Sequence, residues 1–260
     1  MLVYIFDRTL DGLLCAVFDA FSLRQQPEAL VGRGEPLPLF CDETHWVETA
    51  EDRAQRVWRG LEKRLGKDAL RMLAVSYLSE LSELDLPLFN YICKIFRRPE
   101  GSRCVELNFA DPDVLAVRNI CRKVLHEQLR MKQFIRFQKA KDGTYLAVVS
   151  PDHDVLPLVT DHFRDRFGDQ PWLIYDAKRQ YGFHYDQQNL TRIQFPEGER
   201  LPFDLKSGQM DEQILSENDK TFQELWRTYF KAICIQERMN PRKQLNDMPR
   251  RYWKYMTEKQ

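Results

Sequence analysis

The sequence has 260 residues, of which 43% are hydrophobic and 30% charged, and its 39 basic and 39 acidic side chains give a net charge of zero. This composition excludes a disordered chain, and the length fills one large domain or two of ordinary size. The first residues, MLVYIFDRTLDG, contain no basic segment and reach an aspartate after six residues. They are therefore predicted to be neither a signal peptide nor a membrane span, and we expect a cytoplasmic protein without membrane contact.

The charge is distributed unevenly along the chain. Residues 121–260 contain 24 basic and 20 acidic side chains, whereas residues 1–120 contain 15 and 19. Within residues 220–260 alone, ten basic side chains stand against four acidic ones. A basic half on a neutral protein is consistent with a localised nucleic-acid-binding face.

The cysteines are scattered and form no CxxC pair. This spacing predicts reduced, mostly buried thiols, and it gives no zinc or iron–sulfur site made by this chain alone. We expect no cofactor. The six positions are Cys15, Cys41, Cys93, Cys104, Cys121 and Cys234.

The first elements are predicted to be a buried strand at residues 2–6 and a helix that Thr9 caps. Asp7, Arg8 and Asp11 lie at the turn between them, where such side chains either cap the helix or form a ligand site. Residues 26–44 are rich in glycine and proline and are predicted to be an irregular connection.

The next part of the chain is predicted to be helical. Apolar residues at helical spacing run from residue 49 to residue 98, with Thr49 as the first cap, and they indicate helices that pack against a core. Asp111 and Pro112 then mark the start of another helix.

The second half is predicted to contain a sheet. Asp142-Gly143 marks a hairpin, a helix is expected over residues 155–167, and three further strands follow. Those strands are residues 172–175, 181–185 and 190–195, and helices are expected at residues 221–238 and after Pro249. We therefore expect an α+β fold, an antiparallel sheet with covering helices plus a helical region. Residues 1–260 are expected to form a single unit, with a helical subdomain at about 45–100 and a basic helical segment at 220–260.

Basic and aromatic side chains alternate in the second half of the chain. Such a pattern suits a phosphate backbone with bases stacked nearby, although a solvated basic surface is the alternative. The candidate nucleic-acid-binding residues are Arg130, Lys132, Phe134, Arg136, Trp172, Lys178, Arg179, Arg238, Arg242, Arg250, Arg251 and Trp253.

Asp152, His153 and Asp154 precede a predicted helix, and Asp176 ends a predicted strand. A carboxylate–histidine pair can move a proton or activate water, so these four residues are the catalytic candidates. The alternative is that an aspartate caps the helix and that His153 lies on the surface. His162 has acidic neighbours at helical spacing but no third ligand, so no metal site is expected.

Several segments carry a family resemblance. The chain begins with FDRTLDGLLCAVFDAF and later contains HEQLRMKQFIRF, PDHDVLPLVTDHFRDRF, WLIYDAKRQYG and LWRTYFKAICIQERMNPRKQLNDMPRRYW, in that order. With these segments it resembles, over nearly its whole length, an uncharacterised bacterial family described as DNA metabolism proteins. One departure is Gln128-Leu129 before Arg130-Met131, where the family has a more compact His-Arg-Met.

The resemblance implies a place in DNA repair. Members of that family are typically encoded beside a radical-SAM protein assigned to DNA modification or repair, and a related domain is fused to uracil-DNA glycosylase-like proteins. The expected function is therefore a DNA-binding accessory protein that acts with a radical-SAM partner, docked through the helices of residues 50–98. The alternative is a DNA-processing enzyme, glycosylase-like or hydrolytic, with an Asp/His site at residues 152–154.

Overall fold

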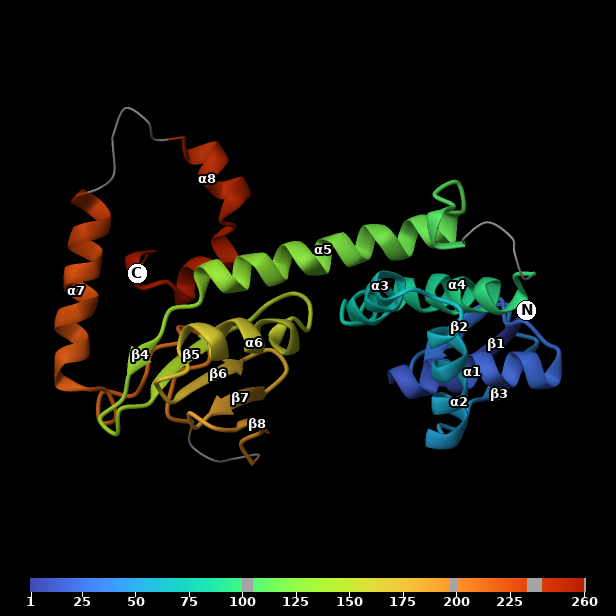
Figure 1. The fold of residues 1–260 in the computed structure, drawn as a ribbon, viewed down its shortest axis with the longest axis horizontal. Helices are drawn as coiled ribbons and strands as arrows, with labels where there is room; N and C mark the ends of the chain where they lie inside the picture. The colour runs from blue at the N-terminus through green and yellow to red at the C-terminus, as the bar shows by residue number, and fades with distance from the viewer. Residues whose placement is uncertain (100–104, 197–200, 233–239, 260) are drawn as a thin grey trace. The chain divides into compact units, whose positions relative to one another are not determined.

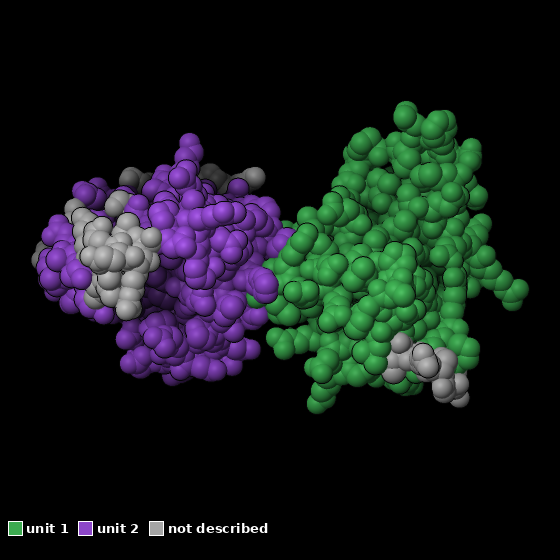
Figure 2. Space-filling view, turned by 90° about the horizontal axis from the view of Figure 1, so that it is seen from above, with its two compact units in different colours: residues 1–125 green, residues 126–260 purple. Residues whose placement is uncertain are grey.

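A computed structural model describes residues 1–99, 105–196, 201–232 and 240–259. The chain divides into two compact units, residues 1–125 and 126–260 (Figure 2), where the sequence had suggested a single unit with helical additions. The division falls within the 23-residue helix α5 (Pro112–Phe134). As predicted, Asp111 caps this helix, since its carboxylate accepts the backbone N–H groups of Asp113 and Val114 at 2.9 and 3.3 Å.

The first unit contains a parallel three-stranded sheet in the order β2-β1-β3 (Figure 1). Its central strand β1 (Leu2–Phe6) is the predicted buried strand. The prediction of an irregular connection at residues 26–44 was wrong in part, because β2 (Ala29–Gly32) and the start of β3 (Glu43–Trp46) lie there. Both are only four residues long and gain their backbone partners from β1, so local sequence gives little sign of them.

Helices cover this sheet and account for the helical region predicted from the sequence. They are α1 (Leu10–Leu23), α2 (Glu51–Glu62), α3 (Lys67–Tyr77) and α4 (Asp85–Arg97), with short 3-10 turns η1 (Ser82–Leu84) and η2 (Val105–Leu107).

Two predicted helix caps have different outcomes. Thr9 caps α1 as predicted, since its hydroxyl oxygen accepts the N–H of Gly12 at 2.9 Å. Thr49 does not cap α2, because its hydroxyl donates to the carboxylate of Asp7 at 2.8 Å and the capping position belongs to Ala50. Asp7 therefore joins the end of β1 to the segment that precedes α2, which favours the structural interpretation of this turn.

The second unit contains a five-stranded sheet in the order β4-β5-β6-β7-β8. The strands are β4 (Gln138–Lys139), β5 (Tyr145–Val149), β6 (Trp172–Asp176), β7 (Tyr181–Tyr185) and β8 (Leu190–Ile193). Only β5 and β6 are parallel; α6 (Leu156–Arg166) connects them and lies across one face of the sheet (Figure 1). The other pairs are antiparallel, so the predicted α+β class and mostly antiparallel sheet are confirmed.

The two faces of this sheet have different covers. On one face Phe163 of α6 packs against Trp172, with ring centroids 6.3 Å apart. On the other face, Tyr175 packs against Phe203, which belongs to the irregular segment that follows β8. The central strands are therefore covered on both faces, and side chains of the sheet reach solvent mainly on the edge strands, at strand ends and in the connecting turns.

Helical segments end the chain. The predicted helix at residues 221–238 is α7 (Glu217–Ala232), and the rest of that prediction lies outside the described residues. The helix α8 (Pro241–Asp247) was not predicted; Asn240 caps it by accepting the N–H of Lys243 at 3.0 Å. The 3-10 helices η4 (Arg250–Tyr255) and η5 (Thr257–Lys259) follow.

Three of the cysteines predicted to be buried, Cys15, Cys93 and Cys121, are buried free thiols, and Cys41 is partly exposed. Cys104 and Cys234 lie outside the described residues. Among the helices that the structure describes, none has the length and apolar character needed to cross a membrane.

Candidate nucleic-acid interface

A buried carboxylate organises the turn that carries three of the catalytic candidates. Glu127 of α5 has 2% of its surface exposed and accepts the backbone N–H groups of Asp152 and His153, both at 3.0 Å. Its carboxylate also accepts the hydroxyl of Tyr252 at 2.7 Å. This role was not predictable from the sequence, because a lone acid in a basic helix is normally exposed.

Arg251 completes this cluster. Its guanidinium donates to Glu127 at 3.1 Å and lies 2.8 Å from the carboxylate of Asp152. Burial by itself raises the pKa of Glu127, but the hydrogen bonds from Tyr252, Asp152 and His153, together with the charge of Arg251, bring that pKa below its ordinary value. Glu127 is therefore held as an anion that binds the turn and the C-terminal segment together.

Asp176 at the end of β6 has no exposed surface. Its carboxylate accepts the backbone N–H groups of Lys178 and Arg179 at 2.8 and 3.2 Å and the Arg179 guanidinium at 2.7 Å. Burial raises the pKa of Asp176 in spite of these partners. Because a substrate cannot reach a fully buried carboxylate, Asp176 fits a structural role.

The same turn is linked to β7 and to the turn after β6. The hydroxyl of Tyr181 donates to Asp154. The pKa of Tyr181 is raised, mainly by burial and further by this hydrogen bond to Asp154. The ammonium of Lys178 and the guanidinium of Arg179 donate to the backbone oxygen of Asp152 at 2.7 and 3.0 Å. The four catalytic candidates thus lie in one network of ion pairs and hydrogen bonds that holds two turns in place.

His153 belongs to this network as well. Its Nε2 atom lies 4.0 Å from the carboxylate of Glu127. Within the described residues, no group of three or more histidine, cysteine and acidic side chains is placed to hold a metal ion.

Several of the predicted phosphate-binding cations already have anionic or carbonyl partners. Arg136 pairs at 2.6 Å with Glu258, whose side chain is 1% exposed. Arg179 and Arg251 are held as described above, and Arg238 lies outside the described residues.

The prediction that Trp172 stacks on bases needs correction. Trp172 has 1% of its surface exposed and packs against Tyr185 with ring centroids 5.5 Å apart. The central position of β6 in the sheet buries it from both sides, so its ring offers no face to a base.

Lys178 and Arg251 are exposed but bonded within the network described above. The other candidates at the surface lie in α8, η4 and the last turns of α5. Arg242 and Arg250 are exposed, and Arg130, Lys132 and Phe134 are partly exposed. The guanidinium of Arg130 donates at 3.2 Å to the backbone oxygen of Asn246, which ties α8 to α5. These residues form a basic surface on the second unit.

Trp253 is the aromatic side chain of this surface. The Arg250 guanidinium lies 5.8 Å from its ring centroid and the Lys259 ammonium lies 5.0 Å from it. Its Nε1–H donates to the backbone oxygen of Met248 at 3.0 Å, and this hydrogen bond restricts the orientation of the ring. An indole flanked by two cations suits an aromatic ligand that carries negative charge. Lys259 belongs to this group although it was not among the candidates predicted from the sequence.

A family model for a domain of unknown function, DUF4130, matches residues 82–258. The chain belongs to this family. The DUF4130 match extends from η1 and α4 through nearly all of the second unit, and it contains Glu127, the Asp152–Asp154 turn and Trp253. No curated protein and no solved structure matches the chain.

Proposed function

We propose that this protein is a cytoplasmic, nucleic-acid-binding accessory protein of DNA metabolism. The observation that carries the proposal is the indole of Trp253 with the cations of Arg250 and Lys259 at 5.8 and 5.0 Å from its ring centroid. Base stacking on an aromatic ring, with phosphates held by neighbouring cations, is the common way in which proteins bind single strands. The strand-binding surface would then comprise α8, η4 and the last turns of α5.

The charge of this segment supports the proposal. Residues 240–259 contain six basic and two acidic side chains. Arg242 and Arg250 have no ion pair with any carboxylate that the structure describes, so their guanidiniums can bind phosphate without first breaking one. Arg130 is held near them by its bond to Asn246. We take these three arginines as the phosphate contacts.

A surface for a protein partner is also present. On α7, Phe222 and Leu225 are 68% and 59% exposed, and Trp226 and Tyr229 continue the same apolar face at positions i+4 and i+7. Such a face fits a hydrophobic groove on another protein. The family resemblance supports a radical-SAM repair protein as the partner. Trp58 and Tyr77, in the helices where docking was expected, are only partly exposed, so α7 is the better surface.

The alternative function is a DNA-processing enzyme with an Asp/His site at residues 152–154. Asp152 and His153 come together there, but Asp152 is paired with Arg251 and Asp176 is inaccessible. The geometry therefore favours binding over catalysis.

The experiment is fluorescence-anisotropy titration of the full chain with a labelled single strand and with the matching duplex. Trp253→Ala should weaken single-strand binding roughly tenfold, whereas Trp253→Phe, which keeps a stacking ring but loses the bond to Met248, should keep most of the affinity. Arg164→Ala is the charge control, because Arg164 lies on α6 and pairs with Asp161. Arg250→Ala should weaken single-strand binding more than Arg164→Ala does. Equal losses of affinity in these two variants would count against the proposal.

A further inference from the structure

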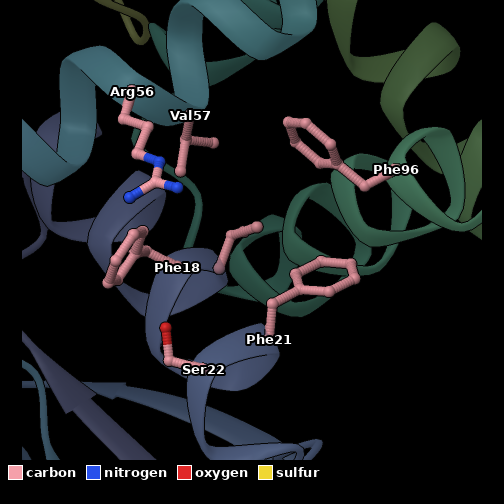
Figure 3. A pocket seen from close by; sticks show the side chains of 7 residues that line it. Phe18, Phe21, Ser22, Arg56, Val57 and Phe96 are labelled. Carbon is pink, nitrogen blue, oxygen red and sulfur yellow. The ribbon is translucent and has the colours of Figure 1, made fainter.

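The first unit contains an open groove of about 440 Å³ between α1, α2 and α4. Phe18, Phe21 and Ser22 line it from α1, Arg56 and Val57 from α2, and Phe96 from α4 (Figure 3). From the sequence, the helices of residues 49–98 were expected to pack against a core. The groove lies at their surface, where Phe21 remains 41% exposed.

Two of the phenylalanines pack edge to face across the groove. The ring centroids of Phe21 and Phe96 are 5.9 Å apart, and their planes meet at 71°. Gly60 of α2 makes room for Phe96, because a Cβ atom at this position would lie 2.7 Å from the ring. Any larger residue at position 60 would displace Phe96, so the shape of the groove depends on this glycine.

Arginines surround the same three rings. The guanidiniums of Arg53 and Arg56 lie 5.8 and 5.7 Å from the ring centroid of Phe18. Arg64 lies 5.0 Å from the centroid of Phe96, and Arg97 lies 5.6 Å from that of Phe21. All four distances are within the range of cation–π attraction, about 6 Å.

The positive charge of these arginines is largely uncompensated. Arg53 lies 3.6 Å from a carboxylate oxygen of Asp19. Arg97 donates to the neutral amide oxygen of Gln26 at 2.7 Å and Arg64 to the backbone oxygen of Gly60 at 3.2 Å. In the described part of the chain, no carboxylate pairs with Arg56, Arg64 or Arg97. The groove thus combines one exposed and two partly exposed aromatic rings with positive charge that an anion can neutralise.

We propose that this groove is a second nucleic-acid site, which takes an unpaired nucleotide of a single strand. The base would stack on the phenylalanines or on an arginine plane, and the adjoining phosphates would bind Arg56 and Arg64. The volume lies within the usual range for small-ligand sites, about 300–1,000 Å³. The inference rests on the proposed function for the class of ligand, but it uses residues of the other unit.

The test is equilibrium binding of a labelled deoxyadenosine trinucleotide to the full chain. Phe21→Ala removes an exposed ring and should weaken binding about tenfold, and Arg56→Ala should weaken it severalfold. Arg59→Ala is the matched control, since Arg59 lies on the same helix and lines a different pocket with Asp11 and Glu62. Gly60→Ala changes the shape of the groove without changing its charge, and it should also weaken binding. Circular dichroism confirms that each variant is folded.

The results separate this site from the one at Trp253. The groove variants are measured in a Trp253→Ala background, so that the surface at Trp253 does not contribute. Weaker trinucleotide binding by Phe21→Ala, Arg56→Ala and Gly60→Ala in that background, with Arg59→Ala unchanged, supports the groove even if the surface at Trp253 fails its own test. Equal losses for Arg56→Ala and Arg59→Ala, or no loss for Phe21→Ala, would overturn it while leaving the site at Trp253 untouched. Binding of deoxyadenosine monophosphate as tight as that of the trinucleotide would overturn the assignment to a strand.

Discussion

The guanidinium of Arg251 donates a hydrogen bond of 3.1 Å to the carboxylate of Glu127, which lies 124 positions earlier in the chain. The same carboxylate binds the backbone of the Asp152–His153 turn. One buried anion thereby fixes both the turn predicted to be catalytic and the 3-10 helix η4 that carries Trp253. The position of the basic surface depends on this contact.

Replacement of Glu127 should therefore destabilise the second unit. Glu127→Gln keeps the size of the side chain but removes the charge that three hydrogen-bond donors and Arg251 share, and we expect a loss of about 3 kcal/mol in the free energy of unfolding. Urea unfolding followed by circular dichroism measures it. Glu224→Gln, at an exposed position of α7, is the control, and a similar loss in both variants would contradict this role.

The pH dependence of that difference has a definite sign. The pKa of Glu127 lies below its ordinary value of 4.5 in the folded protein, so the unfolded chain takes up a proton at a higher pH than the folded one. The stability that the anion contributes is thus fully present above about pH 4.5 and is lost as the pH falls below it. The difference between wild type and Glu127→Gln should shrink in that range; a difference that stays constant to lower pH would contradict the assignment.

Asp85 should show the opposite pH dependence. It pairs with Arg8 at 2.9 Å, yet burial raises the pKa of its carboxyl to about 6. The unfolded chain releases this proton near its ordinary pKa of 3.8, whereas the folded protein holds it up to a pH of about 6. The contribution of Asp85 to stability therefore falls as the pH rises from about 4 to about 6. Unfolding of wild type and Asp85→Asn across this range measures it. A contribution that grows with pH would show that the ion pair with Arg8 outweighs burial.

Gly182 of β7 should not tolerate a side chain. A Cβ atom there would lie 2.5 Å from the backbone oxygen of Ile174 in the neighbouring strand. Gly182→Ala must push β6 and β7 apart, and a destabilisation of about 1–3 kcal/mol is expected from overpacking. Thermal unfolding measures it, with Gly66→Ala as the control because its Cβ atom would meet no atom within 4 Å. Equal effects of the two substitutions would be the contrary result.

If α7 is the proposed docking surface, its exposed face should be needed for binding the proposed protein partner and not for binding DNA. Leu225→Glu together with Tyr229→Glu places two charges on this face, at positions that are exposed in the chain alone. We expect loss of co-elution with the proposed radical-SAM partner in size-exclusion chromatography. Affinity for a single strand should stay within about twofold, since the residues proposed to bind DNA lie elsewhere. Co-elution of the double variant with the partner would exclude α7 as the docking surface.

Much of the fold could be predicted because its signals are local. Thr9 caps its helix through its own side chain, and Gly143 adopts the positive φ of 92° that a hairpin turn requires. The strands β2 and β3 could not be predicted, because their order comes from pairing with β1 rather than from their own residues. Thr49 illustrates the same limit, since its hydroxyl binds Asp7 across the fold instead of the adjacent helix.

The site was predictable in part for the same reason. Asp152 and Asp176 follow neighbouring strands of one sheet, so their proximity could be expected from the sequence. The buried partner Glu127 could not, because nothing near it in the sequence shows that Tyr252 and Arg251 fold onto it. Trp172 was a stacking candidate because it is aromatic and lies in the basic half of the chain, but Phe163 of α6 and Tyr185 of β7 bury its ring.

The most direct test of nucleic-acid binding is the dissociation constant of the wild-type protein for a single-stranded oligonucleotide at about 50 mM and about 200 mM salt. With Arg130, Arg242 and Arg250 as phosphate contacts, affinity should fall about twentyfold between these two conditions, and Arg250→Ala should reduce the slope of log K against log salt by about 0.7. No measurable binding at the lower salt concentration, or binding that is independent of salt, would contradict the proposed function.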